Sequence, residues 1–184
     1  MTIIDNLLVG KTPEEVLIFG PNKMFIDEYL WFEENAGIVV AYQVKEHDTE
    51  GHFGILRGVD MIEIFGQAGT SACTALEGKK QNKTRDELAE NFRFVFLGVD
   101  QCRFSGMAKA GEILICFGKI RSYRFRQMTL DGSLYKVPND FDYHHFFNSF
   151  SEVDFQKEAL PDTFSEVANF KKLSGRAIKI DKII

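Results

Sequence analysis

Cysteine is scarce in this 184-residue chain, which has only Cys73, Cys102 and Cys116. The three are far apart and form neither a paired disulfide framework nor a Cys-X-X-Cys site. Such a pattern is typical of reduced, buried thiols in a cytosolic protein.

Excess basic charge and long hydrophobic runs are also missing. The formal net charge is -5, which argues against a nucleic-acid-binding protein. No run reaches the ~18 apolar residues that a membrane span needs. Residues 1–8 lack the basic start and the continuous apolar segment of a signal peptide. We therefore expect a cytoplasmic protein that binds neither membranes nor nucleic acids.

Hydrophobic residues make up 45% of the chain, and 18 of all residues are phenylalanine. This composition predicts a folded protein with an aromatic-rich core. A chain of this length suits one domain with an elaboration and buries roughly 70% of its unfolded surface. We find no internal repeat and no low-complexity linker.

The order of the expected elements indicates an α+β fold. Aromatic and β-branched segments predict strands, and one long segment predicts a helix: strands at 24–33, 38–47, 92–104, 112–126 and 127–137, and the helix at 58–78. This order excludes the alternation of a doubly wound parallel sheet. It favours an antiparallel sheet wrapped around a single helix.

The segment 58–78 has apolar residues at three- and four-residue steps and mostly apolar or small residues on its other side. A helix of this kind is buried. The small residues between 66 and 72 would let a neighbouring sheet approach closely. Gly66 and Gly69 lie within this helix and do not follow a strand, so they do not indicate a phosphate-binding loop.

The flanking regions are less regular. Residues 12–15 carry a helix-start signal, and 20–22 predict a turn. Residues 79–91 read as a charged, solvated connection. We expect a domain at 1–138 with a short leader, and an extension at 139–184 that contains a short helix at 162–173.

The strongest indication of catalytic chemistry is a pair of residues. His52 lies just before the long helix, and Glu63 lies inside it. Glu63 stands among apolar residues in the sequence: Met61, Ile62, Ile64 and Phe65. Burial would raise the pKa of this carboxyl group. A carboxyl group of raised pKa and an imidazole can together move two protons near neutral pH.

Two neighbours of Glu63 have alternative interpretations. Asp60 is a competing acid, or a first-turn charge favoured by the helix dipole. Gln67, one turn after Glu63, could orient the carboxyl group or make a helix-packing contact.

Two further clusters are weaker. His144 and His145 near Asp140 and Asp142 lack a third spaced ligand, so we expect no metal site. A basic stripe (Lys119, Arg121, Arg124 and Arg126) predicts a solvated strand face. Its alternative role is docking of an acidic carrier protein or of a phosphopantetheine phosphate.

Several motifs in one order resemble the β-hydroxyacyl-acyl-carrier-protein dehydratases of fatty-acid synthesis, which have the hotdog fold. The matching segments are residues 24–28, Gly51-His52-Phe53, the helix from Arg57 to Gly69 with Glu63 and Gln67-Ala68-Gly69, residues 97–104, and residues 110–114. They span roughly residues 20 to 137. Residues 54–57 form a shorter segment than in the family and lack its prolines.

The resemblance implies a dimer in which the histidine and the acid of one site come from opposite subunits. His52 would remove the α proton of a (3R)-hydroxyacyl thioester, and Glu63 would protonate the departing hydroxyl group. The backbone N–H of Gly58 would bind the thioester carbonyl oxygen. Phe53 and Gln67 would contact the substrate.

The implied enzyme is a hydro-lyase of lipid metabolism that forms a trans-2-enoyl thioester. It needs no metal or redox cofactor, because the thioester itself stabilises the enolate. The phosphopantetheine arm belongs to the substrate, which is carried by the partner, an acyl carrier protein or coenzyme A. Some relatives assemble as trimers of dimers. Two alternatives are a hotdog thioesterase, with Glu63 or Asp60 activating water, and a non-catalytic binder of acyl thioesters.

Overall fold

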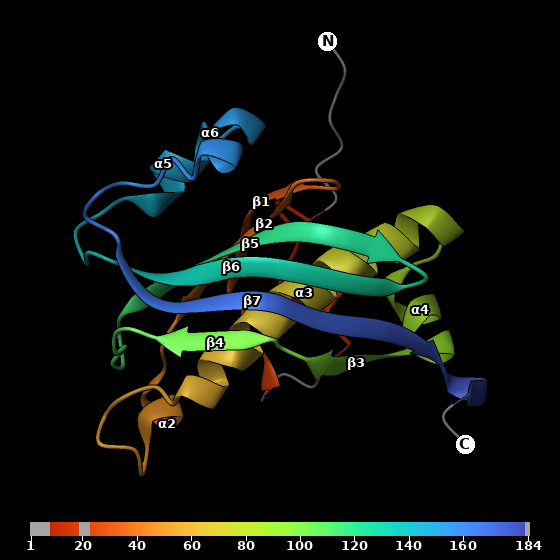
Figure 1. Ribbon diagram of the computed structural model, residues 1–184, viewed down its shortest axis with the longest axis horizontal. Helices are drawn as coiled ribbons and strands as arrows, with labels where there is room; N and C mark the ends of the chain where they lie inside the picture. The colour runs from red at the N-terminus through yellow and green to blue at the C-terminus, as the bar shows by residue number, and fades with distance from the viewer. Residues whose placement is uncertain (1–7, 19–22, 183–184) are drawn as a thin grey trace.

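The computed structural model describes residues 8–18 and 23–182, and its main feature is one antiparallel sheet packed on a long helix (Figure 1). The sheet contains seven strands: β1 (Glu28–Glu33), β2 (Gly37–Gln43), β3 (Phe92–Gly98), β4 (Gln101–Phe104), β5 (Ile113–Arg124), β6 (Gln127–Val137) and β7 (Ser165–Lys179). Their order is β1-β2-β5-β6-β7-β3, and β4 also pairs with β7. The expected α+β class is therefore confirmed.

The helices are α1 (Pro13–Val16), α2 (Glu46–Thr49), α3 (Gly58–Gln81), α4 (Arg85–Asn91), α5 (Tyr143–Asn148) and α6 (Glu152–Lys157), with a 3-10 turn at Ile180–Lys182. The long helix α3 is capped at its C-terminus by Asn82, which has the left-handed φ of 52° common at helix ends. The stretch expected to be a solvated connection contains α4. This helix begins because the Thr84 side chain accepts a hydrogen bond from the Glu87 amide in a capping box. The turn expected at 20–22 lies outside the described residues.

The inner face of the sheet and α3 enclose the main core. Phe65 of α3 stacks on Phe170 of β7, with ring centroids 4.7 Å apart. Gly132 of β6 makes room for this packing, because a Cβ atom there would lie 2.7 Å from the Phe65 ring. The long helix is buried as predicted, although its face near Val59 and Glu63 is exposed.

The expected helix at 162–173 is wrong, because most of this stretch belongs to β7, between β6 and β3. Val167, Phe170 and Leu173 are buried at three-residue intervals, which resembles a helical pattern. The interval arises from irregular pairing with β6, whose register shifts near residues 134–135 and 130–132. Each bulge resets the alternation of a strand. The sheet thus extends beyond residue 138.

A second aromatic core covers the outer face of the sheet. Val39 and Ala41 of β2 point away from α3 because side chains alternate along a strand. They pack under α5 and α6, which lie together at one end of the sheet (Figure 1). Phe155 of α6 stacks on both Trp31 and Phe117, each with ring centroids 4.4 Å apart.

Candidate functional site

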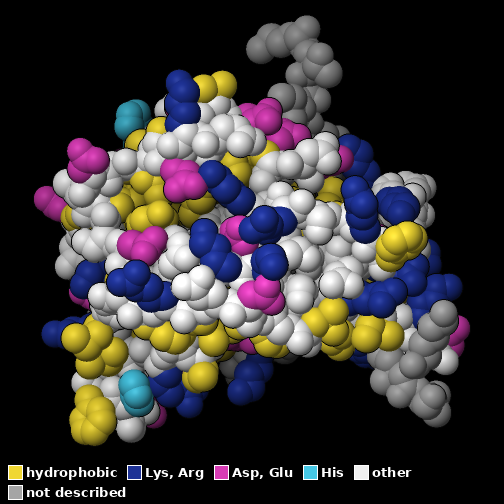
Figure 2. All heavy atoms as spheres, in the orientation of Figure 1, with side chains coloured by type: hydrophobic (Ala, Val, Ile, Leu, Met, Phe, Trp, Pro, Cys, Tyr) yellow, Lys and Arg dark blue, Asp and Glu magenta, His cyan; other side chains and the backbone are white. Residues whose placement is uncertain are grey.

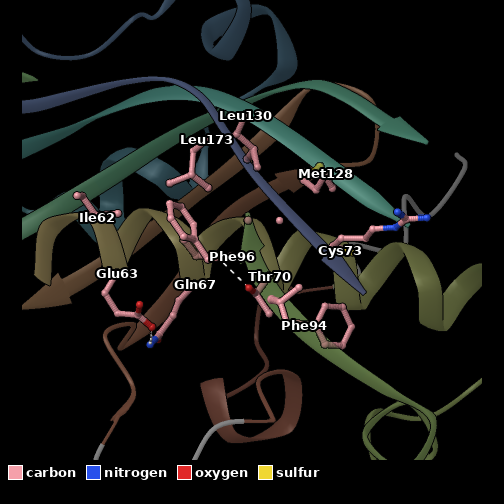
Figure 3. Close-up of a pocket in the computed structure, with 15 residues that line it drawn as sticks. Ile62, Glu63, Gln67, Thr70, Cys73, Phe94, Phe96, Met128, Leu130 and Leu173 are labelled. Carbon is pink, nitrogen blue, oxygen red and sulfur yellow. Dashed lines mark hydrogen bonds between the residues drawn. The ribbon is translucent and has the colours of Figure 1, made fainter. Parts of the chain in front are cut away.

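An apolar pocket of about 250 Å³ lies between α3 and strands β3, β6 and β7 (Figure 3). Its walls come mostly from hydrophobic side chains: Ile62, Cys73, Phe94, Phe96, Met128, Leu130 and Leu173. Glu63, Gln67 and Thr70 add polar groups along α3. A concave apolar site with few polar groups is typical of a small-molecule pocket.

Two glycines of α3 shape the helix wall of this pocket. A Cβ atom on Gly66 would meet nothing within 4 Å, so this position faces open space. A Cβ atom on Gly69 would lie 2.8 Å from Leu130. Gly69 therefore allows the sheet to approach, whereas Gly66 leaves the pocket open.

Glu63 is exposed and lines the pocket, so the expectation that its carboxyl group is buried is wrong. Its sequence neighbours Ile64 and Phe65 are fully buried, but they lie on a different side of the helix. Gln67 orients Glu63, since its Nε2 donates to Glu63 Oε1 over 2.8 Å (Figure 3). The Glu63 carboxyl group is thus held at the wall of the pocket.

The buried Gln67 is itself fixed by the segment before β1. Its Nε2 also donates to the Lys23 carbonyl oxygen over 2.6 Å, and its Oε1 accepts from the Phe25 amide over 2.8 Å. Both sequence interpretations of Gln67 therefore describe real contacts. It orients a carboxyl group, and it joins the helix to the segment before β1.

His52 lies exposed on the loop between α2 and α3. Its Nδ1 is 2.9 Å from the carbonyl oxygen of Ile55. Because a carbonyl oxygen only accepts, Nδ1 carries the proton in this arrangement. The Nε2 atom of the neutral ring is then the basic one, available to take a proton.

Backbone contacts hold this loop in place without prolines. The Leu56 amide donates to the Ala108 carbonyl oxygen over 2.8 Å, and the His52 amide donates to Thr49 over 3.1 Å. Arg57 forms a bidentate ion pair with the buried Asp60. Its Nε donates to Oδ2 over 2.7 Å, and its Nη2 donates to Oδ1 over 2.8 Å. The Asp60 carboxylate is therefore engaged by a guanidinium group.

The other expected site residues are not brought together within one chain. Phe53 is 95% exposed with a φ of 58°, and Gly58 is the first residue of α3, packed against Phe104. Neither these two residues nor His52 line the pocket. In the described part of the chain, no hydrogen bond or ion pair joins His52 to Glu63.

A buried polar cluster beside the pocket was missed in the sequence. Glu77 accepts hydrogen bonds from the Tyr123 hydroxyl group and from Gln81. Burial raises the pKa of the nearby Cys73 thiol to about 12, so this thiol is protonated at neutral pH and is not a nucleophile. The sequence did contain an indication of this cluster, because Glu77 lies one turn after Cys73 in a helix predicted to be buried.

His144 and His145 lie on α5, where His144 is 3.3 Å from Glu28. Within residues 8–18 and 23–182, no group of three or more His, Cys, Asp or Glu side chains is placed to hold a metal ion. None of the helices in these ranges is long and apolar enough to cross a membrane.

An antiparallel sheet wrapped around one long central helix defines the hotdog fold, and the chain is a hotdog-fold protein. It is similar to a chain of the dehydratase heterocomplex ApeI:P from Xenorhabdus doucetiae, with 10% identity and a TM-score of 0.64. The match covers 94% of this chain and 95% of that one.

Two further solved structures share the fold. One is the uncharacterized protein PH1136 from Pyrococcus horikoshii, with 11% identity, a TM-score of 0.50, and 86% and 87% of the two chains covered. The other is AziG from S. sahachiroi, with 10% identity, a TM-score of 0.50, and 83% and 91% covered. No protein-family model matches the chain, and no curated protein matches its sequence.

Proposed function

We propose that this protein is a dehydratase that converts a (3R)-hydroxyacyl thioester to the trans-2-enoyl thioester. The observation that carries the proposal is Glu63, held by Gln67 at the wall of an apolar pocket. The pocket suits an acyl chain, and Glu63 lies where a reacting group beside that chain could reach it. The substrate would arrive on the phosphopantetheine arm of an acyl carrier protein or of coenzyme A. The reaction would belong to lipid metabolism.

The proposed elimination moves two protons. Nε2 of His52 removes the α proton, and the electron pair forms the new double bond as the C–O bond breaks. Glu63 acts as the general acid and gives a proton to the departing hydroxyl group, which leaves as water, because hydroxide is a poor leaving group. The backbone N–H of Gly58, at the positive end of α3, stabilises charge on the thioester oxygen. Phe53 would cover the substrate arm.

The proposal includes a homodimer, because His52 lies outside the pocket that Glu63 lines. In the dehydratases that the sequence resembles, the histidine and the acid of one site come from opposite chains, which is the arrangement proposed here. Strand β3 lies at the edge of the sheet, and it exposes 56% of Phe96 and 50% of Leu97. An open strand edge with exposed apolar side chains favours pairing with a second chain.

The proposal is tested with purified protein and 3-hydroxyacyl thioesters of several chain lengths, by following enoyl-thioester absorbance. We expect turnover by the wild type, and a loss of roughly 10²–10⁴-fold in both His52→Ala and Glu63→Gln. Val153→Ala, at an exposed position of α6 outside the pocket, is the control and should retain full activity.

Two other results would refute the dehydratase. Release of free thiol without enoyl absorbance would indicate a thioesterase. Acyl-thioester binding that survives His52→Ala, without turnover in the folded wild type, would indicate a non-catalytic binding protein.

A further inference from the structure

The hairpin between β5 and β6 ends in an unusual turn. Phe125 and Arg126 have φ angles of 53° and 61°, so both lie in the left-handed region. Two-residue hairpin turns of this kind favour glycine and asparagine, because a Cβ atom makes positive φ costly. Here the turn instead holds a phenylalanine that is 84% exposed. Backbone strain with an exposed aromatic ring points to a function for the turn.

Polar side chains from three strands meet beside this turn, on the face of the sheet opposite to the core residues Tyr123 and Met128. One of them, Arg176, also borders the apolar pocket. The pairing register aligns Arg124 with Gln127 and Gln127 with Arg176 in one row across the sheet. Ser122 and Thr129 form the next row on the same face. Neighbouring strands are about 5 Å apart, so the two arginines start about 10 Å apart and can reach a common point.

These rows line a hollow of about 250 Å³, and none of the described residues in its wall is acidic. The wall consists of Ser122, Arg124, Phe125, Gln127, Thr129 and Arg176. Among the described residues, no side-chain partner satisfies Arg124 or Arg176. Asp131, two residues beyond Thr129, is already engaged by Arg121 and by the Lys172 amide. Figure 2 shows Lys and Arg side chains around an exposed hydrophobic group at the right-hand end of the sheet, where this hairpin lies.

We propose that this hollow binds a phosphate group, with Phe125 offering its ring to a planar base. Guanidinium groups match phosphate oxygens with paired N–H donors, and the Ser122 and Thr129 hydroxyl groups add further donors. An anion would also relieve the repulsion between two unpaired guanidinium groups. The phosphate could belong to a nucleotide or to a simple phosphorylated molecule. The site does not depend on the dehydratase reaction.

The test is calorimetric titration of the full chain at low salt, once with inorganic phosphate and once with adenosine 3′,5′-bisphosphate. We expect saturable binding that weakens at least about tenfold in Arg124→Ala and in Arg176→Ala, since each removes a charge-assisted hydrogen bond. Arg121→Ala is the matched control, because it removes an arginine of the same strand that is paired with Asp131 outside the hollow. Its affinity should stay close to that of the wild type.

Phe125→Gly separates the two sources of phosphate. Glycine relieves the positive φ, so this variant should unfold at a higher temperature than the wild type. If the ligand is a nucleotide, the variant loses the extra affinity for adenosine bisphosphate and keeps its affinity for inorganic phosphate. Equal affinity for both ligands in the wild type, still dependent on the two arginines, supports a simple phosphate site. Absence of saturable binding, or binding unchanged in both arginine variants, overturns the proposal.

Discussion

Replacing Gly66 by leucine is expected to reduce turnover at least about 100-fold while the protein remains folded, because a displaced substrate cannot reach the reacting geometry. Among the glycines of α3, Gly66 is the one at which an added Cβ atom meets nothing within 4 Å, since it faces the pocket. Leucine also favours the helix over glycine by about 0.5–1 kcal/mol. The variant should therefore fill the apolar pocket without loss of stability. Turnover and thermal unfolding are measured on the same preparation.

Gly69 provides the comparison for this experiment. An added Cβ atom there lies 2.8 Å from Leu130, so Gly69→Leu should destabilise the fold. Gly66→Ala should have an intermediate effect on turnover and none on folding. Full activity in a folded Gly66→Leu protein would show that the substrate does not use this pocket.

Replacing Phe155 by alanine is expected to lower the free energy of unfolding by about 3–5 kcal/mol, the usual cost of removing a buried phenyl ring. Phe155 is fully buried and stacks on both Trp31 and Phe117. It also fills the space above Gly37, where a Cβ atom would lie 2.2 Å from the phenyl ring. Chemical denaturation followed by Trp31 fluorescence measures the change.

Val153→Ala in the same helix is the control, because Val153 is 58% exposed. Its effect should stay within about 0.5 kcal/mol. A loss of less than about 1 kcal/mol in Phe155→Ala would mean that α5 and α6 do not stabilise the sheet. The expected large loss would instead make the residues between β6 and β7 an integral part of the fold.

Local patterns were sufficient to predict most of the fold. The helix predicted at 58–78 begins at the predicted residue and ends at Gln81. The antiparallel sheet was predicted because strands stand on both sides of one helix in the sequence. The helix prediction for 162–173 was wrong for a physical reason. Two bulges in the pairing with β6 give this strand the three-residue spacing of buried residues that is typical of a helix.

The candidate site was only partly predictable. Gln67 beside Glu63 follows from the four-residue step of a helix, and the structure joins them by a hydrogen bond. The burial of Glu63 was predicted wrongly, because apolar neighbours in the sequence do not share its side of the helix. The contacts of Gln67 with Lys23 and Phe25 depend on how the chain before β1 crosses the helix, which no local pattern specifies.

The central proposal is that His52 of one chain and Glu63 of another complete one site. Mixing His52→Ala with Glu63→Gln, after unfolding and refolding together, tests it directly with the enoyl-thioester assay. Random pairing puts one intact site in each mixed dimer, so about a quarter of wild-type activity should return. Activity no greater than that of the two separate variants, with mixed dimers present, would contradict the shared site.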